Sequence, residues 1–198
     1  ISNEGPKLSI GDVNGDALDD IYLSQSIGSP KSFSYQFKDG RFITKSNAAF
    51  VLHTEFEDTG HCLFDADGDG DLDMYLLNHN VVVIREFEYA KARETRHPYA
   101  GDKFFRNDNG HFVDVSAEAG VKGSPLGFGL GITVADINKD GWLDMYVSND
   151  YVEPDYVYIN NHDGTFTDRM TEYMQHISYF SLGCDISDIN NDEWPDIF

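Results

Sequence analysis

Asp65-Ala66-Asp67-Gly68-Asp69-Gly70-Asp71-Leu72-Asp73 is an acidic loop that runs directly into the apolar segment Met74-Tyr75-Leu76. The same pattern, with Asp or Asn at positions 1, 3, 5 and 9, begins again at Asp12, Asp136 and Asp188. Short β-prone segments on both sides of a tight loop are typical of a β-hairpin. Four copies in one phase, spaced by roughly 50 residues or more, indicate a repeat protein.

A second hairpin follows each complete acidic hairpin. Its turns are Lys38-Asp39-Gly40, Asn107-Asp108-Asn109-Gly110 and the segment from Asn160 to Gly164. Gly and Asn are favoured there because they tolerate a positive φ. Each unit therefore has four short strands in about 50 residues, the size of one propeller blade. The predicted fold class is all-β: a β-propeller of four-stranded antiparallel blades.

We predict one partial propeller domain over residues 1–198. Its parts are blades at about 7–50, 59–118 and 128–172, an incomplete blade at 179–198, and an insertion at 79–102. Three and a half blades cannot close a ring, and an open ring exposes unpaired backbone at its edges. The chain is therefore expected to be part of a longer propeller.

The repeated loops present oxygen ligands only. Carboxylate and amide oxygens suit Ca²⁺, Mg²⁺ or Mn²⁺ rather than Zn²⁺ or Cu²⁺. Side chains at positions 1, 3, 5 and 9, with the backbone carbonyl of position 7, give six or seven flexible oxygens, which favours calcium. The predicted ligands of up to four Ca²⁺ are Asp12, Asn14, Asp16, Leu18 and Asp20; Asp65, Asp67, Asp69, Asp71 and Asp73; Asp136, Asn138, Asp140, Trp142 and Asp144; and Asp188, Asn190, Asp192, Trp194 and Asp196.

The four loops are expected to differ in affinity. Position 6 favours Gly because its backbone is expected to be left-handed. Gly70 and Gly141 occupy it in two loops, whereas Ala17 and Glu193 occupy it in the others at a cost of roughly 1 kcal/mol each. We predict tighter binding at the Asp65 and Asp136 loops than at the other two.

Two further stretches carry a family resemblance. They are Phe104-Phe105-Arg106-Asn107-Asp108-Asn109-Gly110-His111-Phe112-Val113-Asp114-Val115-Ser116 and Gly183-Cys184-Asp185-Ile186-Ser187-Asp188. Together with the acidic loops, these stretches resemble FG-GAP/VCBS calcium-binding propellers. The resemblance is closest to the ASPIC/UnbV type, which is similar to cartilage acidic proteins. The resemblance implies calcium ligands in each loop, a seven-bladed ring and a secreted or surface lipoprotein. Lys7, at a position where later repeats have Gly, departs from the pattern, as do Ala17 and Glu193.

The composition excludes several classes of partner. The formal net charge is −21, with 35 acidic against 14 basic residues, which disfavours nucleic acid and anionic membranes. The longest apolar run, Val81 to Ile84, is far too short for a transmembrane segment. The start at Ile1 has no features of a signal peptide, so we expect a mature form or a fragment. The predicted location is extracellular or on the cell surface, as an outer-membrane lipoprotein of a Bacteroidota-like bacterium.

Cys62 and Cys184 are too few for a disulfide-stapled scaffold. They lie three and four residues before the first Asp of their loops, so they should face opposite sides of their sheets. We expect buried free thiols, with a disulfide or a catalytic cysteine as the alternative. The seven histidines show no zinc-site spacing.

The insertion between the second and third strands of its blade is rich in basic residues. With its flanks it contains Arg85, Lys91, Arg93, Arg96, Lys103 and Arg106, and it adds Phe87, Tyr89, His97 and Tyr99. A long loop of this kind can recognise an acidic glycan or a protein. Alternatively, it packs on its own propeller and pairs with nearby acids.

Catalytic signatures such as Gly-x-Ser-x-Gly, His-Glu-x-x-His or a phosphate loop are absent from the sequence. We therefore predict a non-catalytic, calcium-stabilised domain that binds or scaffolds proteins or glycans. The alternatives are a carbohydrate-active lyase or hydrolase and a structural subunit of an outer-membrane assembly, in a membrane complex formed through the rest of the protein.

Overall fold

The computed structural model describes residues 6–51, 54, 57–79, 84–85, 88–98, 100–178 and 180–198. In this part of the chain, three four-stranded antiparallel sheets follow one another, and each has its strands in sequence order. The strands are β1 (Leu8–Gly11), β2 (Asp20–Leu23), β3 (Ser32–Gln36) and β4 (Phe42–Ser46); β5 (Glu57–Phe64), β6 (Asp73–His79), β7 (Lys103–Asp108) and β8 (His111–Asp114); and β9 (Gly129–Ala135), β10 (Asp144–Asn149), β11 (Tyr156–Asn160) and β12 (Phe166–Asp168).

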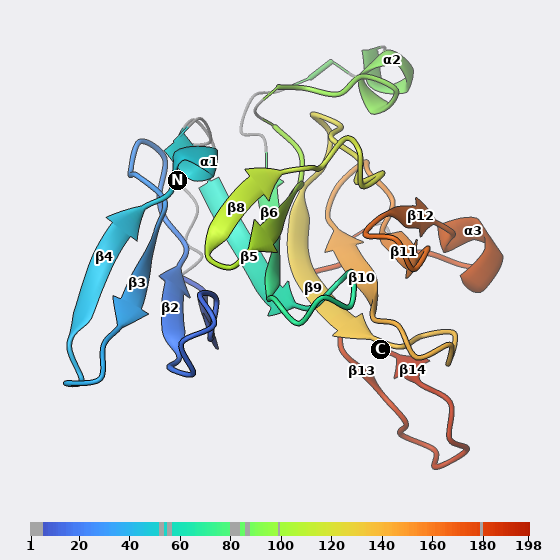
Figure 1. The fold of residues 1–198 in the computed structure, drawn as a ribbon. Coiled ribbons are helices and arrows are strands. Elements are labelled where there is room, and N and C mark those ends of the chain that lie inside the picture. The colour runs from blue at the N-terminus through green and yellow to red at the C-terminus, as the bar shows by residue number, and fades with distance from the viewer. Residues whose placement is uncertain are drawn as a thin grey trace.

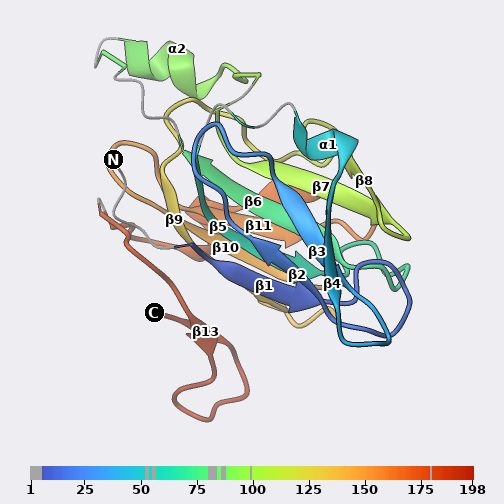
Figure 2. The ribbon, with the colours of Figure 1, turned by 90° about the vertical axis from the view of Figure 1, so that its left-hand side faces the viewer.

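A fourth unit is a single hairpin that projects from the third sheet (Figures 1 and 2). It pairs β13 (Ile186–Ser187) with β14 (Asp196–Ile197), and two further backbone hydrogen bonds join Asp185 to Phe198. Its first strand begins at Ile186. The described residues also form three short helices: α1 (Ala48–Val51), α2 (Tyr89–Arg93) and α3 (Met170–Tyr173).

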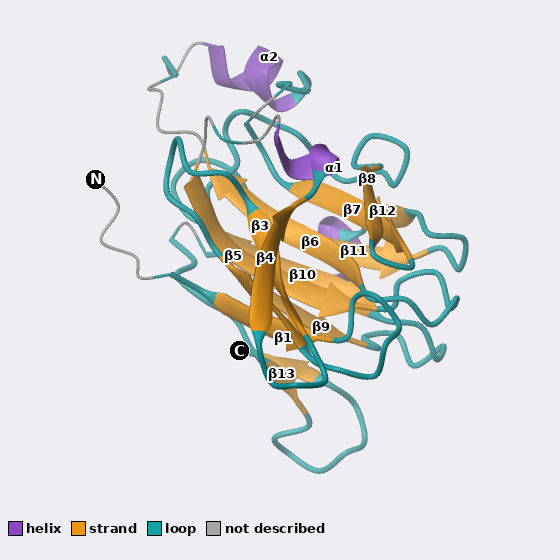
Figure 3. Ribbon diagram, turned by 60° about the vertical axis from the view of Figure 1, so that its left-hand side comes forward, coloured by secondary structure: helices purple, strands orange, loops and turns teal. Residues whose placement is uncertain are grey.

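The sheets stack face to face as propeller-like blades (Figure 3). Side chains alternate along each strand, so Met74 and Leu76 of β6 pack toward the first sheet while Tyr75 and Leu77 pack toward the third. Aromatic rings fill both interfaces, as where Phe33 stacks on Phe112 with 5.1 Å between centroids. Burial of both faces of the second sheet is what holds neighbouring sheets together.

A tyrosine in the second strand of each sheet donates to a buried aspartate. Tyr75 bonds Asp102 at 2.8 Å and Tyr146 bonds Asp155 at 2.7 Å, and each aspartate lies just before the third strand of its own sheet. In the first sheet this position is Lys31, and Tyr22 instead bonds Asp58 of β5 at 3.0 Å. Lys31 and Asp58 form an ion pair whose side chains are 1% and 0% exposed. The first two sheets are thus joined by a buried charge pair.

His61 lies at the junction of β1 and β5, and it is buried. Its Nε2 lies 3.3 Å from the carbonyl oxygen of Lys7 and its Nδ1 lies 2.6 Å from Ser9 Oγ. Because a carbonyl oxygen only accepts, Nε2 donates and Nδ1 accepts, as in the neutral ring. Burial is the main cause that lowers the pKa of His61 to about 4, and nearby Lys31 lowers it further.

His61 is expected to make the stability of the folded protein sensitive to acid. The unfolded chain protonates His61 below about pH 6.5, whereas the folded chain does so only near pH 4. Stability therefore rises with pH across this window, and acidification from about pH 6.5 to 4 should remove roughly 3 kcal/mol through this residue. Urea unfolding across the window should show a flatter pH dependence for His61→Gln than for the parent or for exposed His111→Gln. Equal pH dependence in all three proteins would contradict the prediction.

Candidate metal centre

The first aspartate of each acidic loop closes the loop by accepting backbone hydrogen bonds. Asp65 Oδ1 accepts from Gly68 N at 2.8 Å, and its Oδ2 accepts from Gly70 N at 3.0 Å. Equivalent bonds to the residue at position 6 are made by Asp12, Asp136 and Asp188. The four loops therefore share one backbone shape, set by the same side chain.

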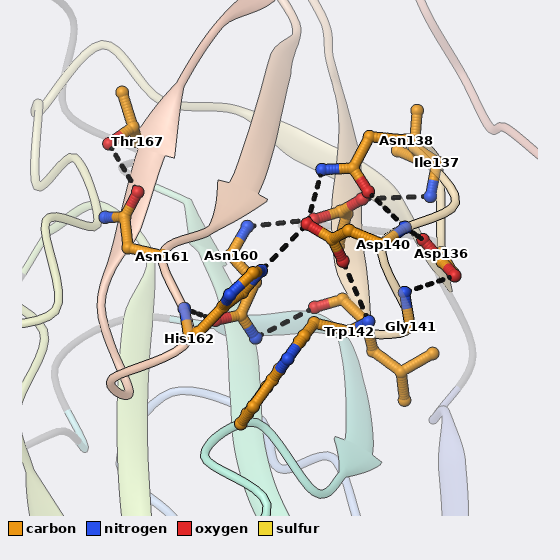
Figure 4. A network of polar contacts seen from close by, with 12 residues as sticks. Asp136, Ile137, Asn138, Asp140, Gly141, Trp142, Asn160, Asn161, His162 and Thr167 are labelled. Carbon is orange, nitrogen blue, oxygen red and sulfur yellow. Dashed lines mark hydrogen bonds and ion pairs between the residues drawn. The ribbon is translucent and has the colours of Figure 1, made fainter.

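Positions 3 and 5 continue the pattern. Asn138 Oδ1 accepts from Asp140 N at 3.0 Å, and Asp140 Oδ1 accepts from Trp142 N at 2.9 Å (Figure 4). Each bond reaches two residues ahead, as in an Asx turn. The same bonds recur in the other loops. They hold the side-chain oxygens of positions 3 and 5 against the inner curve of the loop.

The aspartate at position 9 is the buried member of each complete loop. Asp144, with 0% exposure, accepts from Ile137 N at 2.9 Å with Oδ2 and from Asn160 N at 2.8 Å with Oδ1. Asp20 and Asp73 make the same two contacts. This one carboxylate therefore ties the acidic loop to the third strand of its sheet.

The position-9 contact predicts a stability effect. Asp144→Asn keeps one acceptor oxygen but leaves a buried backbone N–H without a partner, which costs about 1–3 kcal/mol. Chemical unfolding in chelator should show this loss, so that the effect is independent of any metal. The matched control is Asp163→Asn in an exposed turn, where the carboxylate bonds only Thr165. An equally small effect in both variants would contradict this role of Asp144.

Two positions of each loop have a left-handed backbone. Position 6 is left-handed as expected, with φ of 92° at Gly70 and 91° at Gly141, and also 64° at Ala17 and 70° at Glu193. Position 4 is left-handed as well, which was not predicted from the sequence; the residues there are Gly15, Gly68, Lys139 and Asn191. Only the second loop has Gly at both positions, so its backbone carries the least strain.

Carboxylates converge most clearly in the second loop. One oxygen each of Asp65, Asp67 and Asp73 lies within 4.8 Å of the others, a cluster that can hold a metal ion. Burial is the main cause that raises the pKa of Asp73 to about 7, and the negative charges of Asp67 and Asp69 add to it. A cation between these groups would relieve both effects, since it favours the ionised carboxylates.

The donor set fits calcium. Positions 1, 3 and 9 of the second loop already face one another, and all their ligand atoms are hard oxygens. In the other loops Asn14, Asn138 and Asn190 supply an amide oxygen at position 3. The position-5 carboxylate of each loop accepts a hydrogen bond from the backbone N–H of position 7, which is Leu18, Asp71, Trp142 or Trp194. That the carbonyl oxygens of these position-7 residues bind the ion stays a prediction.

Sequence reasoning overlooked two asparagines beside the loops. Asn107 is the penultimate residue of β7 and Asn160 is the last residue of β11, and both are buried. The sequence pattern favours ordinary hairpin turns at these positions. Their shared signal is an Asn three or four residues before the turn Gly in two successive repeats. Each bonds the acidic loop of its own sheet and that of the preceding sheet.

The described part of the insertion, with α2, lies at the end of the sheets away from the β5–β6 and β9–β10 loops (Figure 1). Arg93 Nε donates to buried Glu153 at 2.9 Å, and Arg96 donates to the backbone oxygen of Val121. These two bases therefore anchor the segment. Arg85 and Lys91 are exposed, and Phe87 and Tyr99 lie outside the described residues.

Both cysteines are free thiols. Cys62 of β5 packs into the core between the second and third sheets, and burial raises the pKa of its thiol to about 12. Cys184 lies just before β13, not within it, and packs against the opposite face of the third sheet. Neither thiol is poised as a nucleophile, because burial disfavours the thiolate and raises both pKa values.

The described helices are all too short or too polar to cross a lipid bilayer.

Comparison with known proteins places the chain in a family. The model for the FG-GAP-like repeat matches residues 95–147 and 138–198. A solved structure of a lectin from Agrocybe aegerita, described as specifically recognising non-reducing terminal N-acetylglucosamine, is similar with a TM-score of 0.58 and 18% identity. The match covers 98% of this chain and 47% of that one, so the chain spans about half the lectin's length. At this identity the similarity shows the fold alone. A search of curated protein sequences gave no match.

Proposed function

Because this chain belongs to the FG-GAP-like repeat family, we propose that it is a calcium-stabilised section of a larger propeller that binds glycans without catalysis. The observation that carries the calcium part is the second loop, where three carboxylates converge. Glycan binding is supported by the similar fold of a lectin that spans about twice this length. The proposal includes a seven-bladed ring of the ASPIC/UnbV type and a location outside the cell or on its surface.

The chain's own residues give calcium a structural role. Asp65, Asp67, Asp69 and Asp73 would hold the ion through side-chain oxygens, and Asp71 through its carbonyl. Asp73 also accepts from Asn107 N at 2.8 Å. A cation held there would fix the connection between β5 and β6 relative to β7. Since the same contacts recur in the first and third sheets, calcium would set the relative positions of strands that carry a ligand surface.

The test is a glycan array probed with the chain in about 1 mM calcium, the range of extracellular sites, and again in chelator. We expect retention of a defined glycan class in calcium and loss of that binding in chelator. Asp67→Ala, which removes a converging carboxylate, should weaken retention, and Asp163→Ala, which alters an exposed turn, should not. Failure of the calcium-loaded chain to retain any glycan would overturn the glycan part. Turnover of a retained glycan would overturn the non-catalytic part.

A further inference from the structure

Asn160 connects two acidic loops that belong to different sheets. Its Nδ2 donates to the carbonyl oxygen of Ala66 in the second loop at 2.8 Å and to that of Leu143 in the third loop at 3.2 Å. Its backbone N–H donates to Asp144 at 2.8 Å, and its Oδ1 accepts from His162 N at 2.8 Å (Figure 4). The residue is 3% exposed. All of its side-chain polar atoms are therefore bonded inside the protein.

Asn107 repeats the arrangement one sheet earlier. Its Nδ2 donates to the carbonyl oxygens of Val13 at 2.9 Å and Leu72 at 3.1 Å, which lie in the first and second loops. Its N–H bonds Asp73 at 2.8 Å, and its Oδ1 accepts from Gly110 N at 2.8 Å. The first, second and third loops are thus joined in series by two equivalent amides.

The carbonyls that accept these bonds lie next to the proposed ligands. Ala66 stands between Asp65 and Asp67, and Leu143 stands directly before Asp144. A loop that is ordered by a cation holds its carbonyl fixed for the amide. The fixed amide then restrains the carbonyl that it bonds in the next loop. That next loop therefore loses less conformational freedom when it binds its own cation.

We propose that Asn107 and Asn160 are positioning residues that couple the loops, so that cation binding in one loop strengthens binding in its neighbour. The proposal rests on the calcium sites proposed above. Because coupling between two sites is reciprocal, disabling the second loop should weaken the third as much as the reverse.

Trp142 strengthens the junction and provides a way to observe it. Its ring lies against Gly68 of the second loop, where an added Cβ would be 3.0 Å from a ring carbon. It also stacks on His162 with 5.0 Å between centroids. The chain has two tryptophans, and the other, Trp194, lies in the fourth loop. Terbium, which replaces calcium at oxygen sites and is excited through a nearby Trp, would report the second and third loops together in a Trp194→Phe background. The backbone amide of Gly141, which bonds Asp136 within the third loop, would report that loop alone in NMR spectra recorded during a calcium titration.

The experiment measures calcium affinity at the third loop, from the chemical shift of the Gly141 amide, with the second loop intact and with it disabled by Asp67→Ala. With Asn160 present, we expect Asp67→Ala to weaken the third loop by about tenfold, within the usual range of coupling between sites. With Asn160→Ala, the same change should weaken it by less than about threefold. If Asn160→Ala itself weakens the third loop, it does so both with the second loop intact and with it disabled, so the ratio of those two affinities is unchanged.

Asn161→Ala is the matched control. Asn161 is the exposed neighbour of Asn160, and its side chain bonds only Thr165 and Thr167 of the same hairpin. The tenfold effect should persist in this variant. If Asn160→Ala does not fold, Asn160→Asp has the same size and also lacks the two donors.

The outcomes separate this proposal from the proposed function. An equal effect of Asp67→Ala with and without Asn160, or no effect in the parent, would overturn the coupling while calcium binding stands. A chain that binds neither terbium nor calcium would overturn both.

Discussion

Calcium at about 1 mM is expected to raise the free energy of unfolding of the chelated chain by roughly 2–6 kcal/mol. Extracellular sites have dissociation constants of about 0.1–1 mM, so each of four loops would add about 0.4–1.4 kcal/mol. Four calcium ions would also bring eight positive charges to a chain of net charge −21. Less self-repulsion then favours the compact state. Urea unfolding in calcium and in chelator measures the difference.

Magnesium at the same concentration is the control for charge alone. It prefers strict octahedral geometry and retains its waters, so it should stabilise the chain much less than calcium. Asp67→Ala should reduce the calcium effect, whereas Asp163→Ala should leave it intact. Equal stabilisation by the two cations would mean that the loops act as a diffuse negative surface rather than as sites.

Replacing Lys31 with methionine is expected to cost about 3–5 kcal/mol, because it leaves the Asp58 carboxylate buried without its counter-charge. Both side chains are almost fully buried, and the Tyr22 hydroxyl at 3.0 Å and Gln25 N at 3.4 Å also donate to that carboxylate. Methionine keeps a similar length and apolar stem, so the change tests the charge rather than packing. Thermal or urea unfolding measures the loss.

Lys45→Met is the matched control. Lys45 is exposed, and its ammonium lies over the Tyr35 ring at 5.2 Å, a contact worth about 0.5–1 kcal/mol at most. Adding Asp58→Asn to Lys31→Met should recover much of the stability, since the unpaired charge is then removed. A Lys31→Met variant as mild as Lys45→Met would show that the pair contributes nothing to the junction.

The four-stranded sheets could be predicted because their signals are local. Alternation of side chains and turn residues such as Asp39-Gly40 give the strand order within one sheet directly from the sequence. The left-handed sixth position was also predictable, since Gly70 and Gly141 mark it. Position 4 was missed although Gly15 and Gly68 mark it in the same way, because Lys139 and Asn191 conceal the pattern in the other two repeats.

The contacts between sheets could not be predicted in this way. Asn160 lies 94 positions from Ala66, and Lys31 lies 27 positions from Asp58. Nothing in a local window states which carbonyl a buried amide will meet. Lys31 stands where the later repeats have Asp102 and Asp155, and that break in the pattern was the available signal. Only stacking of the sheets reveals that the missing carboxylate comes from the next repeat.

The outermost strand of the first sheet has a consequence for handling the protein. All five residues of β4, from Phe42 to Ser46, are exposed, and the far side of the strand has no neighbour in its sheet. Unpaired backbone on such a rim is a template on which a second polypeptide can add as an extra strand. Lys45 is the one charged residue on this strand, so neutralising it by acetylation or at high pH would favour fibrillar aggregation of concentrated samples.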